Sequence, residues 1–300
     1  MSATMLELMQ QTSNELGLTA PSYVVGNTNE LTVQLLSLMN AAGYELLKEY
    51  DWRALQKEYR FYTEAYSYTG TTTNNSYQIT GLSSTAGLDN TFMVTGDGIQ
   101  QDTTIVSVDS PTQVTVNQKA ASTQTGTLTF GKTKYSLPPD YENIADRTQW
   151  DKSKHWEMLG PEDAQQWQWL KSGYISTGPR IRWRILGKYF QIWPIMNTQE
   201  YLGFEYRSKA WAESATGVPK NLFTADTDTT LFDDRLMVLL TKMKFLQAKN
   251  FDTTAVYQDY MRYLNVAKSN DKGAATLSFA PYPSKVLIGY ANIPDTGYGS

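Results

Sequence analysis

Three closely spaced arginines near the middle of the chain carry the side chains best suited to binding another molecule. Arg180, Arg182 and Arg184 alternate with apolar residues, and successive side chains on a β-strand point to opposite faces. The spacing therefore predicts a basic stripe on one face of a strand, which could contact DNA phosphates or an acidic surface of a partner protein. An ordinary solvated sheet face, with the arginines paired to nearby carboxylates, fits the same pattern. The residues expected on the opposite, core-facing side are Ile181, Trp183 and Ile185.

A second group of charged residues consists of four aspartates, Asp226, Asp228, Asp233 and Asp234. Clustered carboxylates could hold a cation, but this spacing lacks the glycine and the terminal glutamate of a calcium-binding loop. Helix capping and favourable placement at a helix N-terminus are the simpler interpretation. We therefore predict no metal site here.

Other residue types that support catalysis are scarce. The chain has one histidine, His155, so no cluster of histidine ligands and no Ser-His-Asp triad can form within one subunit. We expect His155 to be a surface residue. The sequence Gly96-Asp97-Gly98 begins a glycine motif, but no further glycine and no Lys-Ser or Lys-Thr pair follows, so a tight β-turn is the better interpretation. We predict no catalytic residue, no cofactor and no metal, and therefore a protein that is not an enzyme.

The composition narrows the class of protein. With 300 residues, 41% of them hydrophobic, the chain can form one large domain or two ordinary ones. The net charge of -4 gives no sign of a general nucleic-acid-binding surface, so any basic surface must be local. The absence of cysteine excludes disulfides, thiolate metal sites and cysteine nucleophiles. No stretch approaches the ~20 apolar residues that span a bilayer, and the first residues lack the features of a signal peptide, so we expect neither membrane insertion nor export.

Helical periodicity is strongest from Asp233 to Ser269, which predicts an antiparallel pair of helices. Apolar residues recur at intervals of three and four on both sides of a break at residues 250–254. Such a hairpin has two apolar stripes and needs further elements to cover them. The best partner is a helix over residues 29–51, for which Asn29 is a suitable N-cap. With a shorter helix at residues 5–16, these segments predict a bundle of three or four helices.

Residues 65–131 differ abruptly in composition from the rest of the chain. They contain sixteen threonines and only five charged side chains among 67 residues. Short runs of alternating apolar residues are separated by Gly, Asn, Asp and Pro, as expected of a small β-sandwich or barrel. Because helical periodicity resumes afterwards, we interpret residues 63–131 as a β-module inserted into the surrounding domain.

The segment after the insertion combines helices and strands. The predicted elements are a helix opening near Asp140, a helix from Pro161 to Gly173, and strands at residues 179–185, 189–193 and 201–207. The first two strands are close enough to form a hairpin, and we expect the third to complete a small antiparallel sheet with them. Proline and glycine are frequent near the end of the chain and indicate an extended tail.

The predicted fold is of the α+β class: a helical bundle with a small antiparallel sheet, plus an inserted all-β sandwich or barrel. The predicted organisation is residues 1–62 and 132–271 for the bundle domain with its sheet, residues 63–131 for the β-module, and residues 272–300 for an extended C-terminal tail.

The order of these elements resembles the head-to-tail adaptor (connector) proteins of short-tailed bacteriophages. The resemblance covers residues 1–62 and 132 to about 280, and it rests on local matches. These are Trp52-Arg-Ala-Leu55 at the end of the long helix, Leu137-Pro-Pro-Asp140 before a helix at Arg147, Pro179-Arg180, Tyr189-Phe-Gln-Ile-Trp-Pro194, Leu202-Gly-Phe-Glu-Tyr206 and Phe245-Leu-Gln-Ala-Lys249. The threonine-rich insertion departs from the simplest members and resembles the immunoglobulin-like modules of phage structural proteins.

The resemblance implies a structural protein of the virion head-tail junction, assembled in the host cytoplasm. Copies would form a homo-oligomeric ring, usually twelvefold in that family, between the portal protein and the tail nozzle protein. The ring would extend the DNA channel, with non-specific contact to the genomic DNA, and would provide the platform for tail attachment. The three arginines would face a partner or the channel, and the tail would dock on the portal or on a neighbouring copy. The tail residues expected to dock are Leu277, Phe279, Tyr282, Val286, Ile288 and Tyr290.

Two other classes of function remain open from the sequence. The threonine-rich module and the many Trp and Tyr residues would also suit a peripheral tail component that binds a receptor or a glycan. A tail-associated hydrolase acting through unrecognised carboxylates is the enzymatic alternative, and the lack of a paired acidic motif disfavours it.

Overall fold

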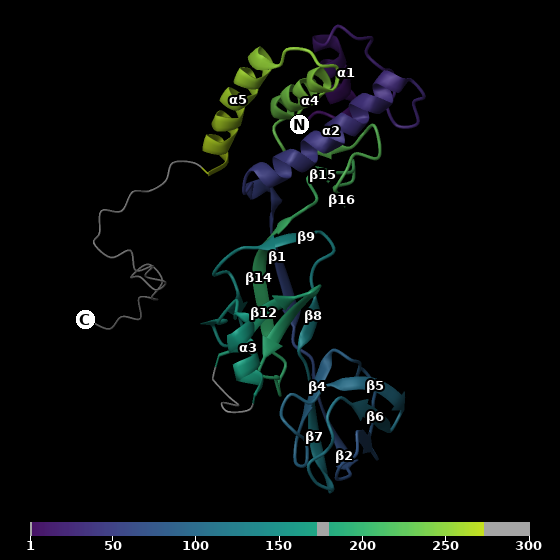
Figure 1. The fold of residues 1–300 in the computed structure, drawn as a ribbon, viewed down its shortest axis with the longest axis vertical. Helices are drawn as coiled ribbons and strands as arrows, with labels where there is room; N and C mark the ends of the chain where they lie inside the picture. Colours follow the sequence, from purple (N-terminus) through teal and green to yellow (C-terminus); the bar gives the residue numbers. More distant parts are fainter. Residues whose placement is uncertain (1, 173–179, 273–300) are drawn as a thin grey trace, which may run out of the picture.

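The computed structural model describes residues 2–172 and 180–272. These residues form three parts that follow one another along the long axis of the molecule: a helical part, a central part of two sheets, and a six-stranded sheet (Figure 1). The described chain has five α-helices and several antiparallel sheets, which agrees with the predicted α+β class. The helical part is built from both ends of the described chain, so the chain passes between it and the central part twice.

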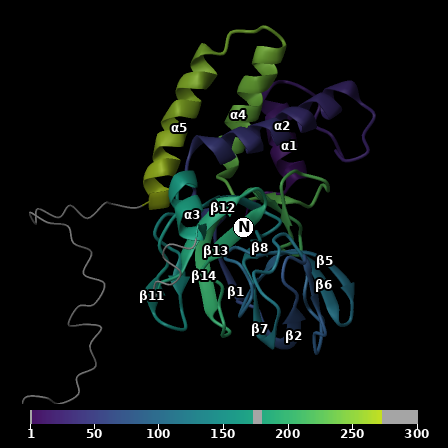
Figure 2. The same cartoon turned by 60° about the horizontal axis from the view of Figure 1, so that its bottom comes forward.

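Helix α4 is the centre of the helical part. The helices are α1 (Met5–Glu15), α2 (Glu30–Glu49), α4 (Asp234–Ala248) and α5 (Thr254–Lys272). Helix α4 contacts the other three, so side chains around most of its circumference are buried, among them Val238 and Leu240. Helices α4 and α5 form the predicted hairpin (Figures 1 and 2). At the reversal, Asn250 has a left-handed φ of 58°, and the Asp252 carboxylate accepts a hydrogen bond from the Thr254 amide at 3.0 Å.

The predicted cap of α2 is confirmed, because the Asn29 side chain accepts a hydrogen bond from the Leu31 amide at 3.0 Å. A small sheet lies between the helices and the central part and consists of β15 (Ala212–Glu213), β16 (Pro219–Lys220) and β17 (Thr229–Thr230). In the described residues no helix combines the length and apolar character needed to cross a membrane.

Two antiparallel sheets form the central part. The first contains β1 (Gln56–Tyr62), β9 (Tyr141–Ile144), β10 (Trp150–Asp151), β11 (Trp156–Glu157) and β14 (Tyr201–Ser208); the second contains β8 (Lys134–Ser136), β12 (Arg182–Leu186) and β13 (Tyr189–Trp193). Their side chains share one aromatic core, in which the Phe190 ring stacks on Trp183 and Phe204 at centroid distances of 5.4 and 5.0 Å. A short 3-10 helix (Arg53–Leu55) leads into β1.

The helix predicted between Pro161 and Gly173 is α3 (Ala164–Lys171), which is shorter at both ends. Asp163 is its N-cap, and the Asp163 carboxylate accepts a hydrogen bond from the Gln166 amide at 2.7 Å.

The predicted partner of β14 is wrong. This strand does not join the β12–β13 hairpin but pairs with β1 along seven residues, and β8 takes the place beside β13. The alternation of apolar residues indicates that each segment is a strand, but it does not specify which strand lies next to it. Pairing with β1 places Phe204 in the core between the two sheets.

The helices predicted near Asp140 and Arg147 are also wrong. The Asp140 carboxylate accepts hydrogen bonds from side chains on β1 and β14 instead of from the amides of a helix, and the extended strand β9 follows it. Arg147 has a left-handed φ of 60°, which an α-helix excludes.

Residues 65–132 form one six-stranded antiparallel sheet. Its strands are β2 (Ala65–Thr72), β3 (Gln78–Thr80), β4 (Phe92–Thr95), β5 (Ile105–Ser110), β6 (Gln113–Val116) and β7 (Gln124–Lys132), in the order β4-β7-β2-β3-β6-β5. The sheet curls until its two ends meet, where the Val94 amide donates to the Thr103 carbonyl at 2.9 Å and Met93 opposes Thr104. Of the two predicted architectures this closure is nearer to a barrel, and the immunoglobulin-like resemblance stays a prediction.

A buried apolar cluster joins the six-stranded sheet to the central part. Its members are Met93, Trp167, Leu170 and Trp193, with Ile195 packed against them. Gly131 allows the two parts to approach closely, because a Cβ atom at this position would lie 2.8 Å from the Cβ atom of Ile195. Packed apolar side chains therefore hold this junction together, as they do inside a domain core.

The junction between the helical and central parts, which we call the waist, has a different character. Its cross-contacts are polar: Lys48 pairs with Glu142, and the guanidinium of Arg207 pairs with Asp51. Among the buried apolar clusters formed by residues 2–172 and 180–272, one lies in the helical part and another in the central part, and none spans the waist.

Candidate interaction surfaces

The predicted basic stripe is only partly present. In β12 the side chains of Trp183 and Ile185 pack into the core, as predicted, while Arg182 and Arg184 lie on the opposite face. Arg180 is exposed but precedes the first residue of the strand. The three guanidinium groups therefore do not form a row on a single strand.

Arg182 is engaged within the molecule. Its Nη1 atom donates to Oε1 of Glu162 at 2.6 Å, and the Glu162 side chain is only 6% exposed. The Glu162 amide donates to the carbonyl of Trp183 at 3.0 Å, so this pair also fastens the segment before α3 to the edge of β12. The alternative of an arginine paired to a nearby carboxylate is therefore correct for Arg182.

The other two arginines have no ion-pair partner in the part of the chain that the structure describes. Arg184 lies opposite Gln191, which lies opposite Lys134 on β8. Directly opposed residues of antiparallel strands share a face, so Arg184 and Lys134 are on the same face of the second sheet. Arg180 lines a cavity of about 570 Å³ between the central part and the six-stranded sheet, together with Lys154.

The four aspartates act separately. Capping is confirmed for Asp233, whose carboxylate accepts a hydrogen bond from the Leu236 amide at 3.0 Å, and Asp234 lies in the first turn of α4. Capping is wrong for Asp226, which accepts hydrogen bonds from the backbone amides of a loop at residues 24–25, and for Asp228. No group of three or more His, Cys, Asp or Glu side chains within residues 2–172 and 180–272 is arranged to hold a metal.

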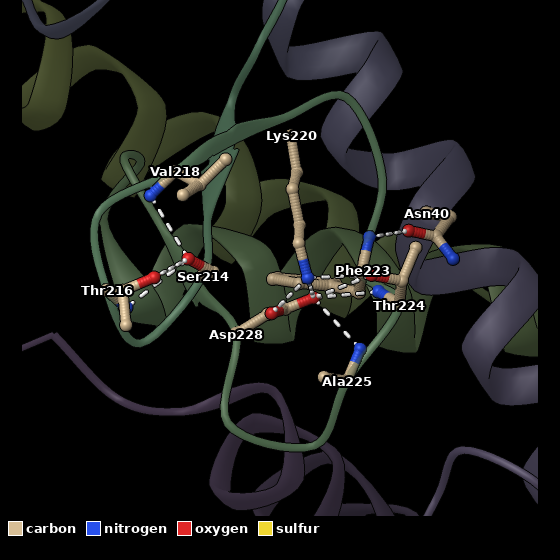
Figure 3. Close-up of polar contacts among 9 residues, drawn as sticks. All are labelled: Asn40, Ser214, Thr216, Val218, Lys220, Phe223, Thr224, Ala225 and Asp228. Atoms are coloured by element: carbon tan, nitrogen blue, oxygen red, sulfur yellow. Dashed lines mark hydrogen bonds and ion pairs between the residues drawn. The ribbon is translucent and has the colours of Figure 1, made fainter.

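Asp228 organises the loop between β15 and β17 (Figure 3). Its buried carboxylate accepts hydrogen bonds from Nζ of Lys220 at 2.7 and 2.9 Å and from the amides of Thr224 and Ala225 at 2.8 and 2.9 Å. Burial acts to raise the pKa of Asp228, but these donors outweigh it and hold the pKa below the usual value. The loop is also fixed to α2, because the Phe223 amide donates to the side chain of Asn40 at 2.8 Å.

A groove of about 590 Å³ lies at the waist. One wall comes from Pro139 and Asp140, which precede β9, and the other from the loop of Figure 3. The lining residues are Pro139, Asp140, Lys209, Ala210, Pro219, Lys220, Asn221, Leu222 and Thr224. We call this the waist groove.

The Asp140 carboxylate in the waist groove is fully engaged. It accepts hydrogen bonds from Nζ of Lys57, the hydroxyl of Tyr206 and the hydroxyl of Ser208, each at 2.8 Å. Burial acts to raise the pKa of Asp140, but these hydrogen bonds outweigh it and lower the pKa. The sequence showed Asp140 only as the end of a Leu-Pro-Pro-Asp run, and neither Asp140 nor the other groove residues were predicted to line a binding surface, because the groove joins segments far apart in the chain.

The remaining predictions concern His155, the turn at Gly96 and the C-terminal tail. His155 is exposed in the turn between β10 and β11, as expected of a surface residue. The tight turn at Gly96 is confirmed, because the Ile99 amide donates to the Gly96 carbonyl at 3.2 Å. The six tail residues predicted to dock, Leu277, Phe279, Tyr282, Val286, Ile288 and Tyr290, lie outside the described residues.

Comparison with known proteins supplies the class of protein. Residues 112–281 match the SU10 adaptor protein family. The match covers more than half of the chain, from the six-stranded sheet through the central part to α5, and the chain belongs to this family. No curated protein matches the chain.

Membership of the family agrees with the coarser part of the resemblance. The protein is a bacteriophage structural protein, an adaptor that is a component of the virion and interacts with other phage head and tail proteins. The family is a structural class and not a class of enzymes.

Proposed function

We propose that this adaptor forms a ring between the portal protein and the tail nozzle protein, extends the DNA channel and provides the platform on which the tail assembles. The observation that carries the proposal is the match of residues 112–281 to the SU10 adaptor family. The three-part architecture supports it, since an elongated chain can present different parts to different neighbours (Figure 1). The ring would contain several copies, and the twelvefold symmetry implied by the resemblance is part of the proposal.

The proposal is tested by the mass of the complexes that the purified protein forms with and without the portal ring of the same virus. Size-exclusion chromatography with light scattering should show that several copies associate with each portal ring. A portal that elutes with no added mass, at protein concentrations well above those of the portal, would contradict the proposal.

Within this function, we propose that Arg180 and Arg184 contact DNA or an acidic partner, whereas Arg182 acts structurally. The first two have no ion-pair partner among the described residues, and Lys134 adds a cation to the face of Arg184. Replacing Arg180 and Arg184 by Ala should weaken attachment to DNA or to the partner and make it less sensitive to salt, because fewer counterions are released. Arg262→Ala is the matched control, since Arg262 is highly exposed in the helical part. Equal effects of the two changes would contradict this assignment.

We also propose that the C-terminal tail docks on the portal or on a neighbouring adaptor copy. The tail residues Leu277, Phe279, Tyr282, Val286, Ile288 and Tyr290 offer apolar side chains in a segment rich in proline and glycine. Since α5 continues to Lys272, a variant that ends at this residue keeps all the described helices. It should lose ring attachment while retaining the circular dichroism and the melting temperature of the full chain. Unchanged attachment would argue against a docking tail.

A peripheral tail component that binds a receptor or a glycan is the second candidate. The observation that favours it is Tyr77, which is 47% exposed on the six-stranded sheet beside the amino group of Lys119, 5.6 Å from its ring centre. Exposed aromatic rings are suitable surfaces for the apolar faces of sugars. Glycan-array binding by the full chain that is lost in Tyr77→Ala would support this candidate over the adaptor ring.

A further inference from the structure

The waist groove has the chemistry of a site for an extended peptide segment. Pro139, Pro219 and Leu222 give it apolar walls, and the Leu222 side chain is 47% exposed although it is large and apolar. The two walls belong to different parts of the molecule, because Pro139 precedes β9 of the central sheets, whereas Leu222 belongs to the loop that Lys220 and Asp228 hold.

The charges in the groove define which ligand it would accept. Asp140 is neutralised by Lys57 and satisfied by two hydroxyl groups, and Lys220 is bound to Asp228. The Lys209 side chain, by contrast, has no hydrogen-bond or ion-pair partner among the described residues, although it lines the groove. A complementary ligand therefore carries a carboxylate next to an apolar side chain.

One segment of this chain has that combination. Residues 273–300 contain a single acidic side chain, Asp295, and Ile293 and Pro294 directly precede it. We propose that Ile293–Asp295 of one copy occupies the waist groove of a neighbouring copy, with Ile293 against Leu222 and the Asp295 carboxylate paired with Lys209. This inference rests on the proposed ring, because it requires neighbouring copies.

The length of the chain permits this contact. Twenty residues lie between Lys272 and Ile293, and an extended chain spans up to about 3.3–3.6 Å per residue, which gives a reach of roughly 70 Å. Helix α5 and the β15–β16 region lie on opposite sides of the helical part (Figure 1). An occupied groove would hold the helical part at a fixed angle to the central sheets, since the segment contacts both walls of the waist.

Cysteine cross-linking tests the contact directly, because the chain contains no cysteine of its own. Full-length protein carrying Leu222→Cys is mixed with an affinity-tagged full-length copy carrying Ile293→Cys, with the portal ring present, and oxidised. We expect at least ten times more mixed dimer than with the control Val106→Cys, a residue 56% exposed on the six-stranded sheet. Equal yields, or a cross-link that forms only within a chain carrying both Leu222→Cys and Ile293→Cys, would overturn the proposal.

Charge reversal tests the ion pair within the same assay. Lys209→Glu should reduce the 222–293 cross-link at least fivefold, and adding Asp295→Lys to the tail should restore it. Lys188→Glu, on the exposed turn between β12 and β13, should have no effect. A cross-link that is unaffected by Lys209→Glu, or not restored by the double change, contradicts the assignment of Lys209.

Electron microscopy of the same samples separates this inference from the proposed function. Rings on the portal without the 222–293 cross-link would overturn the groove assignment and leave the adaptor ring intact. A cross-link without rings would support the groove and contradict the ring, and the absence of both would contradict both.

Discussion

Carboxylates that pair with lysine or arginine side chains fix several connections in this protein. Asp228 organises the loop between β15 and β17, Asp140 ties the segment before β9 to β1 and β14, and Glu162 holds the segment before α3 to β12. Asp140 and Glu162 are far in sequence from the strands that they hold, whereas Asp228 is close in sequence to Lys220. Each one satisfies backbone amides or charged groups that would otherwise be costly to bury.

The pairing of Lys220 with Asp228 should contribute substantially to the stability of the helical part. In Lys220→Ala the Asp228 carboxylate, which is 1% exposed, loses its countercharge, and we expect the free energy of unfolding to fall by about 2–4 kcal/mol. Arg262→Ala is the control, because its partner Asp259 is exposed and the two groups are 3.8 Å apart, so its effect should stay below about 0.5 kcal/mol. Urea unfolding followed by circular dichroism measures the free energy of unfolding of both variants. Equal decreases would show that the buried pair of Lys220 and Asp228 stabilises the protein no more than an exposed pair does.

Asp140 should make stability depend on pH in the acid range. Its pKa is lower in the folded protein than the ordinary value of 3.8, so its contribution is complete above that value and is lost as the pH falls through the folded pKa. Asp140→Asn should therefore melt at a lower temperature than the natural protein at pH 7. The difference should shrink as the pH falls below 3.8 and through the lower pKa of the folded protein. A difference in melting temperature that stays constant over this range would rule out Asp140 as the source.

At the scale of elements, the two junctions are built from different interactions. The six-stranded sheet is attached to the central part by the apolar cluster around Trp167 and Trp193, whereas the waist is held by ion pairs such as Arg207 with Asp51. Apolar burial resists relative motion of packed elements, while half-exposed ion pairs are weaker and depend on salt. The angle between the helical part and the central part at the waist is therefore held less firmly than the angle between the central part and the six-stranded sheet.

Two glycines of β7 allow a test of how tightly the six-stranded sheet packs against the central part. A Cβ atom at Gly131 would lie 2.8 Å from the Cβ atom of Ile195 and 3.0 Å from the carbonyl oxygen of Met196, whereas a Cβ atom at Gly126 would meet no other atom within 4 Å. Gly131→Ala should lower the free energy of unfolding by about 1–3 kcal/mol. Gly126→Ala should be neutral or slightly stabilising, since it reduces the freedom of the unfolded chain. If chemical denaturation gives the same change for both, the close approach at Gly131 is not significant.

The sequence predicts the elements whose signals are local. Helices α2, α4 and α5 have apolar residues at intervals of three and four and recognisable caps such as Asn29, and α3 lies in a segment that begins at Pro161 and ends at Gly173 in the sequence. The partner of β14 could not be predicted, because any strand with a matching apolar face is a candidate neighbour. The region of Asp140 was misjudged for a related reason: an Asp after two prolines suits a helix N-terminus, but its actual donors, Lys57 and Tyr206, are distant in sequence.

The contacts of the candidate surfaces also depend on residues that are distant in sequence. Alternation correctly separated Arg182 and Arg184 from Trp183, but only the folded chain places Glu162 against Arg182. The waist groove is assembled from residues near 139, 209 and 220, which no local motif connects. Lys209, which has no side-chain partner among the described residues, could not be distinguished in sequence from any other surface lysine.

In the whole molecule, three parts lie in a row (Figure 1), and the match to the SU10 adaptor family describes a phage structural protein that works by contacting others. The family match begins within the six-stranded sheet and extends past α5, so it spans both junctions. The different strengths of these junctions would allow the helical part to adjust to one neighbour while the two β-sheet parts keep a common orientation.

Electron microscopy of the purified protein mixed with the portal ring of the same virus would show whether copies of this chain form a ring against the portal. We expect a symmetric ring of copies on one face of the portal, around a channel continuous with that of the portal. Portal particles that show no added density, with the protein still separate at high concentration, would contradict it and favour a role at the periphery of the tail.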